Sequence, residues 1–136
     1  MYLLDTCVIS DFVRRYPATL RKIHSLDIGA MYVASITLSE LEFGFVNHPL
    51  NASKAMPIVM ELYAQTQTID LGIQEAVAAA HIRNDLKSRG LMIGKYDLLI
   101  AATALVHDLT LVTSNVAEFG RIKGLRHEDW RVLEGG

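Results

Sequence analysis

The sequence predicts a single α/β domain, residues 1–136, with a central, mostly parallel sheet of four to five short strands and helices on both faces. Short apolar runs alternate along the chain with longer segments of helical periodicity, which is typical of strand–helix units in a parallel sheet. A length of 136 residues allows one compact core but not two domains of ordinary size. Hydrophobic residues make up 51% of the chain and charged residues 21%, which favours a packed globule over a disordered chain.

Two strand-to-helix transitions are predicted in the first part of the chain. Residues 2–4 form an apolar run that ends at Asp5, and the apolar spacing that follows indicates a helix. Pro17 is well placed to open a second helical stretch. Residues 31–35 have the β-branched, apolar composition of a buried strand, so a strand again leads directly into a helix.

The rest of the chain continues this alternation. The Thr-x-x-Glu spacing of Thr37 and Glu40 is that of a capping box, which marks the start of a helix. The elements that follow are expected to be a helix at 51–66, a strand at 68–70, a helix at 72–89 closed by Gly90, a helix at 96–107, a strand at 109–113 and an edge strand at Val132-Leu133.

Charge and hydropathy limit the possible function classes. A formal net charge of −2 argues against a protein that coats nucleic acid by bulk charge, but leaves open an enzyme with local basic groups. Such groups form short clusters, which are also typical of solvated helix faces, at Arg14, Arg15, Arg21, Lys22, Lys87, Arg89 and Lys95. No apolar run approaches the roughly 20 residues that cross a bilayer. Together with a single cysteine, Cys7, this predicts a cytoplasmic protein with no membrane partner.

Oxygen-bearing side chains follow several of the predicted strands. Asp5 ends the first strand, Glu40 lies one helical turn beyond the second, and Asn115 with Glu118 follow a later strand, while Asp97 lies in the first turn of a helix. Ligands of parallel sheets bind beyond the carboxyl ends of the strands. We therefore expect these side chains to converge on one edge of the sheet.

A cluster of this kind is a natural site for a hard cation. Carboxylates brought together repel one another unless protons or cations intervene. Mg²⁺ and Mn²⁺ prefer carboxylate and water oxygens, and a pair of such ions about 4 Å apart can activate water for phosphodiester cleavage. The sequence has no His/Cys pattern with zinc spacing, no Gly-x-Ser-x-Gly elbow and no glycine-rich nucleotide loop after the first strand.

Each of these residues also has a structural explanation. Asp5 could cap the helix that follows it, Glu40 could be the capping-box partner of a threonine, and Asp97 could complement a helix dipole. Ser114 or Asn115 could cap a short helix, which would also account for Asn115 with Glu118. Capping needs only one acid per helix, however, and does not explain why the acids converge on one edge of one sheet.

A set of ordered motifs covers nearly the whole chain. They are Leu4-Asp5-Thr6, Ser35-Ile-Thr-Leu-Ser-Glu40-Leu-Glu-Phe-Gly44, Ile82-Arg83, Gly94-Lys-Tyr-Asp97-Leu-Leu-Ile-Ala-Ala, Leu111-Val-Thr113-Ser-Asn115-Val-Ala-Glu118-Phe119 and Leu125-Arg-His-Glu-Asp129-Trp130. Their order and spacing resemble the PIN-domain family, and within it the VapC-type toxins of bacterial toxin–antitoxin pairs.

The resemblance implies a catalytic site and a metal ion. It implies that Asp5 and Asp97 are the principal Mg²⁺ ligands, with Mn²⁺ as a substitute, and that Glu40 is a further ligand or a base that orients water. Asn115 with Glu118 would form the fourth corner of the catalytic site. Thr6 and Thr113 would orient the ligands through hydroxyl hydrogen bonds.

The resemblance also implies substrate and partners. The activity would be endoribonuclease cleavage of cellular RNA, neutralised by a cognate VapB-type antitoxin, and the protein would be a homodimer. The closing motif, residues 125–130, is similar to that of toxins that cleave transfer RNA. The chain departs from the family at Cys7, where asparagine is usual and a polar side chain beside the site is lost, and at Asn115, where aspartate is common.

Two other function classes are compatible with the sequence. A PIN-like fold with weak or no catalysis would act as an RNA- or antitoxin-binding module, as the departures at Cys7 and Asn115 allow. A DNA nuclease or another metal phosphoesterase is the other alternative, because a two-metal site does not itself distinguish RNA from DNA.

Overall fold

The computed structural model describes residues 1–132, except for the side chains of 49–51, and confirms the predicted α/β architecture. The elements are β1 (Tyr2–Leu4), α1 (Thr6–Val13), α2 (Pro17–Ser25), the 3₁₀ turn η1 (Ile28–Ala30), β2 (Met31–Ala34), α3 (Ser35–Asn47), α4 (Pro49–Gln65), β3 (Gln67–Ile69), α5 (Ile73–Ser88), α6 (Lys95–Val106), β4 (Thr110–Val112), α7 (Val116–Phe119) and β5 (His127–Glu128).

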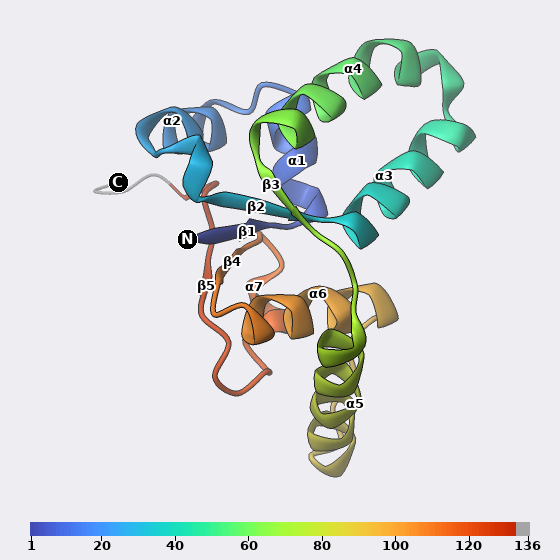
Figure 1. Cartoon of the computed structure of the whole chain (residues 1–136), viewed down its shortest axis with the longest axis vertical. Helices are drawn as coiled ribbons and strands as arrows, with labels where there is room; N and C mark the ends of the chain where they lie inside the picture. The colour runs from blue at the N-terminus through green and yellow to red at the C-terminus, as the bar shows by residue number, and fades with distance from the viewer. Residues whose placement is uncertain (133–136) are drawn as a thin grey trace.

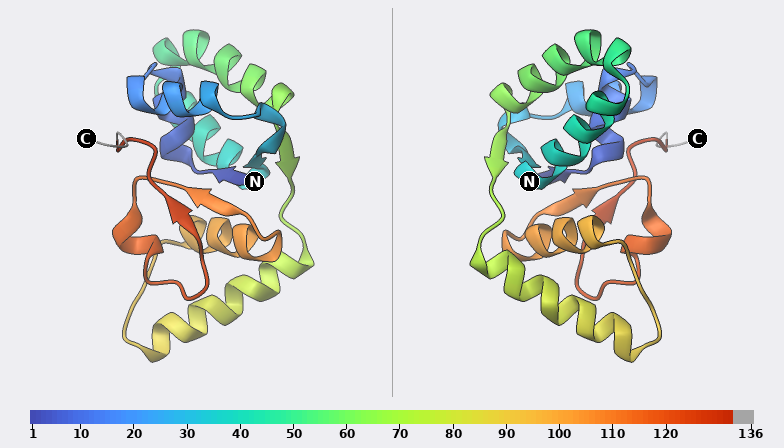
Figure 2. Two further views of the ribbon diagram at one scale, coloured as in Figure 1. Left: turned by 90° about the vertical axis from the view of Figure 1, so that its left-hand side faces the viewer. Right: turned by 90° about the vertical axis from the view of Figure 1, so that its right-hand side faces the viewer.

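The strands form one five-stranded sheet in the order β3-β2-β1-β4-β5, and every neighbouring pair is parallel. Helices α1 to α4 lie on one side of this sheet and α5, α6 and α7 on the other (Figures 1 and 2). The chain winds outward from β1 in both directions, towards β3 and towards β5. Strand order therefore reverses beside β1 and β4, which is where such folds usually bind their ligands.

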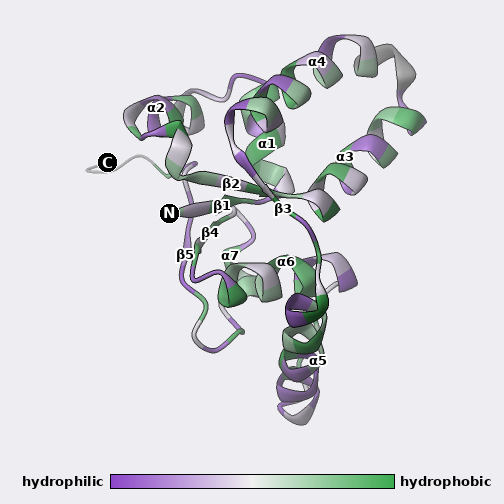
Figure 3. Ribbon diagram, viewed as in Figure 1, coloured by the Kyte–Doolittle hydropathy of each residue, from purple (hydrophilic) through white to green (hydrophobic). Residues whose placement is uncertain are grey.

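Side chains of the central strands alternate between two hydrophobic cores. Leu3 of β1 packs with α5, α6 and α7 residues such as Leu86, Ile100 and Phe119. Its neighbour Leu4 points to the other face, among α1, α2, α3 and α4 residues. A strand buried on both faces needs continuous apolar sequence, which explains why these runs are unbroken. Helix α5 has hydrophobic and hydrophilic residues along its length (Figure 3) because only part of its surface faces the core.

Most predicted elements are confirmed within one or two residues, and two predictions need correction. Helix α3 starts at Ser35, so Thr37 lies inside its first turn and does not cap it. The edge strand is β5 at His127–Glu128, which pairs with β4. The strand expected at Val132-Leu133 is not formed at Val132, and residue 133 lies outside the described part of the chain. Among helices within residues 1–132, none combines the length and apolar character needed to cross a membrane.

Candidate active site

Asp5 lies at the carboxyl end of β1, where strand order reverses. Its side chain is only 6% exposed. Oδ1 accepts a hydrogen bond from the backbone N–H of Thr6 (2.8 Å), and Oδ2 accepts one from the hydroxyl of Thr113 (2.9 Å) at the end of β4. The capping explanation of Asp5 is thus correct as far as it goes, since Asp5 is the N-cap of α1. The bond from Thr113 adds a link across the sheet that capping does not require.

Glu40, in the second turn of α3, reaches the same place. Glu40 Oε1 accepts a hydrogen bond from the Thr6 hydroxyl at 3.0 Å. Thr6 therefore holds Asp5 through its N–H and Glu40 through its hydroxyl. The buried hydroxyl of Thr37 has no hydrogen-bond partner among the described residues, which excludes the predicted capping pair.

Asp97 and Glu118 come from α6 and α7. Glu118 Oε1 accepts the backbone N–H of Gly94 (2.9 Å), which precedes α6, and its Oε2 accepts the side-chain amide of Asn115 (2.8 Å). Asp97 and Glu118 lie close enough that each affects the pKa of the other. Asn115 stands at the N-cap position of α7 as the capping explanation expects, but its side chain makes no cap hydrogen bond, and its amide donates to Glu118 instead.

The electrostatics show that these acids share one region. Burial, followed by the negative charges of Asp5, Glu118 and Glu40, raises the pKa of Asp97 to about 7. Burial is also the main cause of the raised pKa values of Asp5 and Glu40. The pKa of Glu118 is lowered, first by the amide of Asn115 and then by the N–H of Gly94. The expected convergence of the acids is therefore present.

The carboxylate oxygens of the site suit a cation, although they do not surround a single point. Within residues 1–132, no three His, Cys, Asp or Glu side chains stand close enough to hold one ion together. Asp5, Glu40 and Glu118 are each turned to hydrogen-bond donors of their own. Mg²⁺ commonly binds through one or two carboxylates and keeps several waters, so an open group of acids fits its chemistry. Asp5, Glu40, Asp97 and Glu118 are the side chains that could bind it.

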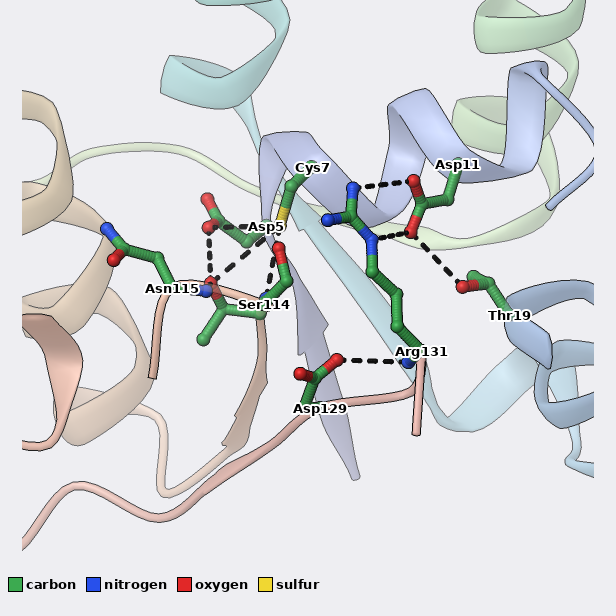
Figure 4. Close-up of polar contacts among 9 residues, drawn as sticks. Asp5, Cys7, Asp11, Thr19, Ser114, Asn115, Asp129 and Arg131 are labelled. Atoms are coloured by element: carbon green, nitrogen blue, oxygen red, sulfur yellow. Dashed lines mark hydrogen bonds and ion pairs between the residues drawn. The ribbon is translucent and has the colours of Figure 1, made fainter. Parts of the chain in front are cut away.

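Cys7 forms hydrogen bonds beside the site. Its Sγ accepts the backbone N–H of Ser114 at 3.3 Å and lies 3.7 Å from Asp5 Oδ2 and from Thr113 Oγ1. Figure 4 shows the thiol between Asp5 and the loop that carries Ser114 and Asn115. The start of α1 is thereby tied to the segment after β4.

A second polar group on α1 was not singled out from the sequence. Asp11 is 3% exposed, and Arg131 donates to both of its carboxylate oxygens at 2.7 and 2.8 Å (Figure 4). Thr19 of α2 donates to the same carboxylate at 3.2 Å. Asp11 is therefore a fully paired acid that anchors the far end of α1. The partners are 120 positions apart in sequence, and no local pattern could indicate the pair.

Comparison with known proteins matches residues 2–125 to the PIN domain family. The tRNA(fMet)-specific endonuclease VapC of Salmonella typhimurium is 33% identical over 129 residues, which cover 95% of this chain and 97% of that protein. Ribonuclease VapC1 of Rickettsia felis is 34% identical over 125 residues, which cover 90% of this chain and 91% of that protein.

Solved structures give the same result. The chain superimposes on the DNA-bound VapBC complex of Salmonella typhimurium with a TM-score of 0.86 and 32% sequence identity, covering 95% of this chain and 97% of the matched one. Sequence and fold thus agree over almost the full length. The chain belongs to the PIN-domain family, and within that family it is of the VapC type.

Proposed function

We propose that this protein is a metal-dependent endoribonuclease and the toxin of a toxin–antitoxin pair. The observation that carries the proposal is the convergence of acids at one edge of the sheet. Thr6 is hydrogen-bonded to both Asp5 and Glu40, and burial together with the charges of Asp5, Glu118 and Glu40 raises the pKa of Asp97 to about 7. Acids that disfavour one another's charge do not stabilise the fold, whereas a divalent cation among them removes the repulsion. Relatives that match nearly the whole chain are named as ribonucleases, which supports the reaction class.

The residues would divide the chemistry between them. Asp5 and Asp97 would hold Mg²⁺, or Mn²⁺ in its place, and a bound cation would polarise the phosphate and acidify a water molecule. Glu40 either adds a ligand or accepts the proton of the attacking water. The raised pKa of Glu40, caused first by burial, makes it a better proton acceptor.

Neighbouring polar groups would fix the orientation of these acids. Thr113 holds one oxygen of Asp5, and Thr6 holds both Asp5 and Glu40. Asn115 holds Glu118 beside Asp97, in place of the further acid that is common in the family. Hydrogen bonds of this kind usually contribute about 10- to 100-fold to metal affinity or activity.

The direct test is cleavage of purified transfer RNA and of total cellular RNA with Mg²⁺, Mn²⁺ or EDTA. Transfer RNA comes first because a relative of nearly full coverage is named a tRNA(fMet)-specific endonuclease. We expect discrete fragments with either metal and none with EDTA. Asp5→Asn should abolish cleavage while preserving α1, because asparagine is as good an N-cap as aspartate.

Glu42→Gln is the matched control for Glu40→Gln, because Glu42 is an exposed acid on the same helix. Glu40→Gln should lower the cleavage rate strongly, and Glu42→Gln should leave it unchanged. Undiminished cleavage in both Asp5→Asn and Asp97→Asn would disprove the proposed site. Parallel assays with DNA of matched sequence separate a ribonuclease from a DNA nuclease.

The proposed partners are a VapB-type antitoxin and a second copy of the chain. A solved structure of nearly full coverage is a VapBC complex, which supports the antitoxin. Exposed apolar side chains on α3 and α5, Phe43 at 70% and Ile73 at 84%, offer surface for protein contacts. Light scattering of the purified toxin should give the mass of a dimer. An RNA substrate and such partners would place the protein in the cytoplasm.

The second candidate is a binding module without turnover. It is favoured by the absence of a closed three-residue metal group within residues 1–132 and by Cys7 in place of the usual asparagine. Such a protein would bind RNA equally well in EDTA and Mg²⁺ and would leave it uncut. Metal-dependent RNA cleavage by the purified protein would exclude the binding module.

A further inference from the structure

A groove of about 610 Å³ opens beside the acids, lined by helices α1, α3 and α4 and by His48 between α3 and α4. It is continuous with the acid cluster because Thr6 and Glu40, which are hydrogen-bonded to each other, both line it. Apolar side chains, among them Val13, Phe45 and Ile58, line another part. The groove therefore joins the proposed reaction site to a surface that can shelter an apolar group.

Basic side chains accompany this apolar lining. Arg14, His48 and Lys54 line the groove, and Glu40 is the acid that lines it with them. Within the described part of the chain, the side chains of Arg14 and Lys54 form no hydrogen bond or ion pair. Their donors are thus available to an anion from outside. Arg14 is the C-cap residue of α1 and Lys54 lies in α4, so the two charges come from different helices.

Gly44 adds an independent observation. It lies inside α3 and lines the groove, and a Cβ atom placed on it would meet nothing within 4 Å. Glycine inside a helix costs about 1 kcal/mol relative to alanine. The packing of the protein does not require this glycine, but its lack of a side chain keeps the groove open. A bound group would use that space.

We infer that the groove binds an unstacked nucleotide of single-stranded RNA next to the scissile bond, with its base against Phe45 and Ile58 and its neighbouring phosphates at Arg14 and Lys54. This inference rests on the proposed ribonuclease function. Proteins that read single-stranded RNA combine a cationic track for phosphates with an aromatic or apolar surface for a splayed-out base. The groove has both, and it leads to the acids where the phosphate would be cut.

The experiment measures RNA binding in EDTA, so that no cleavage is needed. The probe is a short fluorescein-labelled single-stranded RNA, and its affinity is followed by anisotropy across a salt series. The double variant Arg14→Gln/Lys54→Gln should bind about tenfold more weakly or worse. Its slope of log affinity against log salt should fall by about 0.7 for each phosphate that is no longer neutralised. The matched control is Arg83→Gln/Lys87→Gln, which removes the same charge from exposed residues of α5.

A second pair of variants tests the space rather than the charge. Gly44→Leu should fill the groove and weaken binding at least about fivefold, without changing the salt slope. Gly44→Ala changes the helix backbone in the same way but fills little space, and should bind almost as wild type. An RNA with one abasic position should bind more weakly than intact RNA to the wild type, and equally weakly to Gly44→Leu.

Equal affinity of wild type, Gly44→Leu and the Arg14/Lys54 double variant would overturn the inference. Equal weakening in the groove and α5 double variants would also overturn it, because this would show only bulk charge. If the groove variants bound RNA normally but failed to bind the antitoxin, the groove would be assigned to a peptide instead. Failure of the proposed function is distinct: RNA would bind in the groove in EDTA, but addition of Mg²⁺ would never cut it.

Discussion

At each end of helix α6 a carboxyl group lies among titratable side chains: the half-buried Asp97 at its start and, beyond its end, the buried Glu75 of α5. The two environments have opposite effects. In the first turn of α6, burial and the charges of neighbouring acids raise the pKa of Asp97 to about 7. Just beyond its last turn, His107 Nε2 lies 2.7 Å from Glu75 Oε1 of α5. The pKa of Glu75 is lowered, first by a hydrogen bond from its own backbone and then by that of His107. Ten positions separate Asp97 from His107, about 15 Å along a helix.

This contrast separates acids that hold the fold together from acids that a ligand would need. Glu75 also accepts the backbone N–H of Gly72, and Asp11 is paired with Arg131 and Thr19, so both have donors that satisfy a buried charge. Asp97 has other acids as neighbours instead. Buried charges that are paired stabilise a fold, whereas charges that face their like destabilise it until something binds.

The largest expected effect is on activity at the Asp97 end. Asp97→Asn should reduce RNA cleavage by at least about a hundredfold, because it removes a proposed metal ligand. The same change should leave the melting temperature of the metal-free protein equal to or above that of wild type, since a repelling charge is removed. Cleavage assays and calorimetry on the same sample measure both. A clear fall in melting temperature would show that Asp97 is a structural acid after all.

The opposite outcome is expected at the Glu75 end. Glu75→Ala leaves His107 and the N–H of Gly72 without their acceptor, and should lower the free energy of unfolding by about 1–3 kcal/mol. Metal-dependent cleavage, measured well below the melting temperature, should remain close to wild type. Urea unfolding checks the first expectation. The exposed acid Glu42, changed to alanine, is the control. A strong loss of activity in Glu75→Ala without a loss of stability would contradict the contrast between Glu75 and Asp97.

Opposite pH dependences provide a smaller but sharper test. A carboxyl whose folded pKa is raised contributes stability below its unfolded pKa, 3.8 for Asp97, and loses it as pH rises through about 7. For Glu75 the sign is reversed, because its pKa is lowered, and its contribution is lost as pH falls below its ordinary pKa of 4.5. Metal-free Asp97→Asn should therefore lose less stability than wild type between pH about 4 and 8, measured by urea unfolding at each pH.

Bound Mg²⁺ should remove the pH dependence of stability that Asp97 causes in the metal-free protein. A bound cation favours the ionised carboxylate, so binding releases protons and is weaker below pH about 7. Calorimetric titration of Mg²⁺ in buffers of different ionisation enthalpy measures the released protons. The number should fall in Asp97→Asn and stay unchanged in Glu75→Gln. Equal proton release in wild type and Asp97→Asn would contradict the assignment.

The sequence predicted most of the fold because each strand ends in a local signal. The apolar run before Asp5 and the glycine before α6 place Asp5 and Asp97 correctly, since parallel strands share one carboxyl edge. Glu40 lies at the edge that its position after the second strand predicted, but the capping box suggested a helix start three residues too late, since Ala34 and not Thr37 is the N-cap. The local sequence pattern cannot decide whether the helix begins at Ser35 or after Thr37, because tertiary packing decides where it begins.

The contacts that local pattern could not show are the long-range ones. β5 is a two-residue strand whose support is its pairing with β4, so it carries no periodicity of its own. The Asp11–Arg131 pair joins distant parts of the chain. The role of Cys7 depends on Ser114, which lies 107 positions away and comes beside it only through the β1–β4 pairing.

The smallest expected effect concerns Cys7. Cys7→Ala removes the acceptor for the N–H of Ser114 and should cost about 1 kcal/mol of stability or less, because sulfur is a weak acceptor. Cys7→Asn restores a stronger acceptor and adds an amide donor near Asp5, so its cleavage rate should equal or exceed that of wild type, while Cys7→Ala falls a few-fold. Initial rates and urea unfolding of the two variants measure this. If asparagine proved more damaging than alanine, space rather than hydrogen bonding would govern the position. Cys7 would then belong with the packing of α1 and not with the orientation of Asp5.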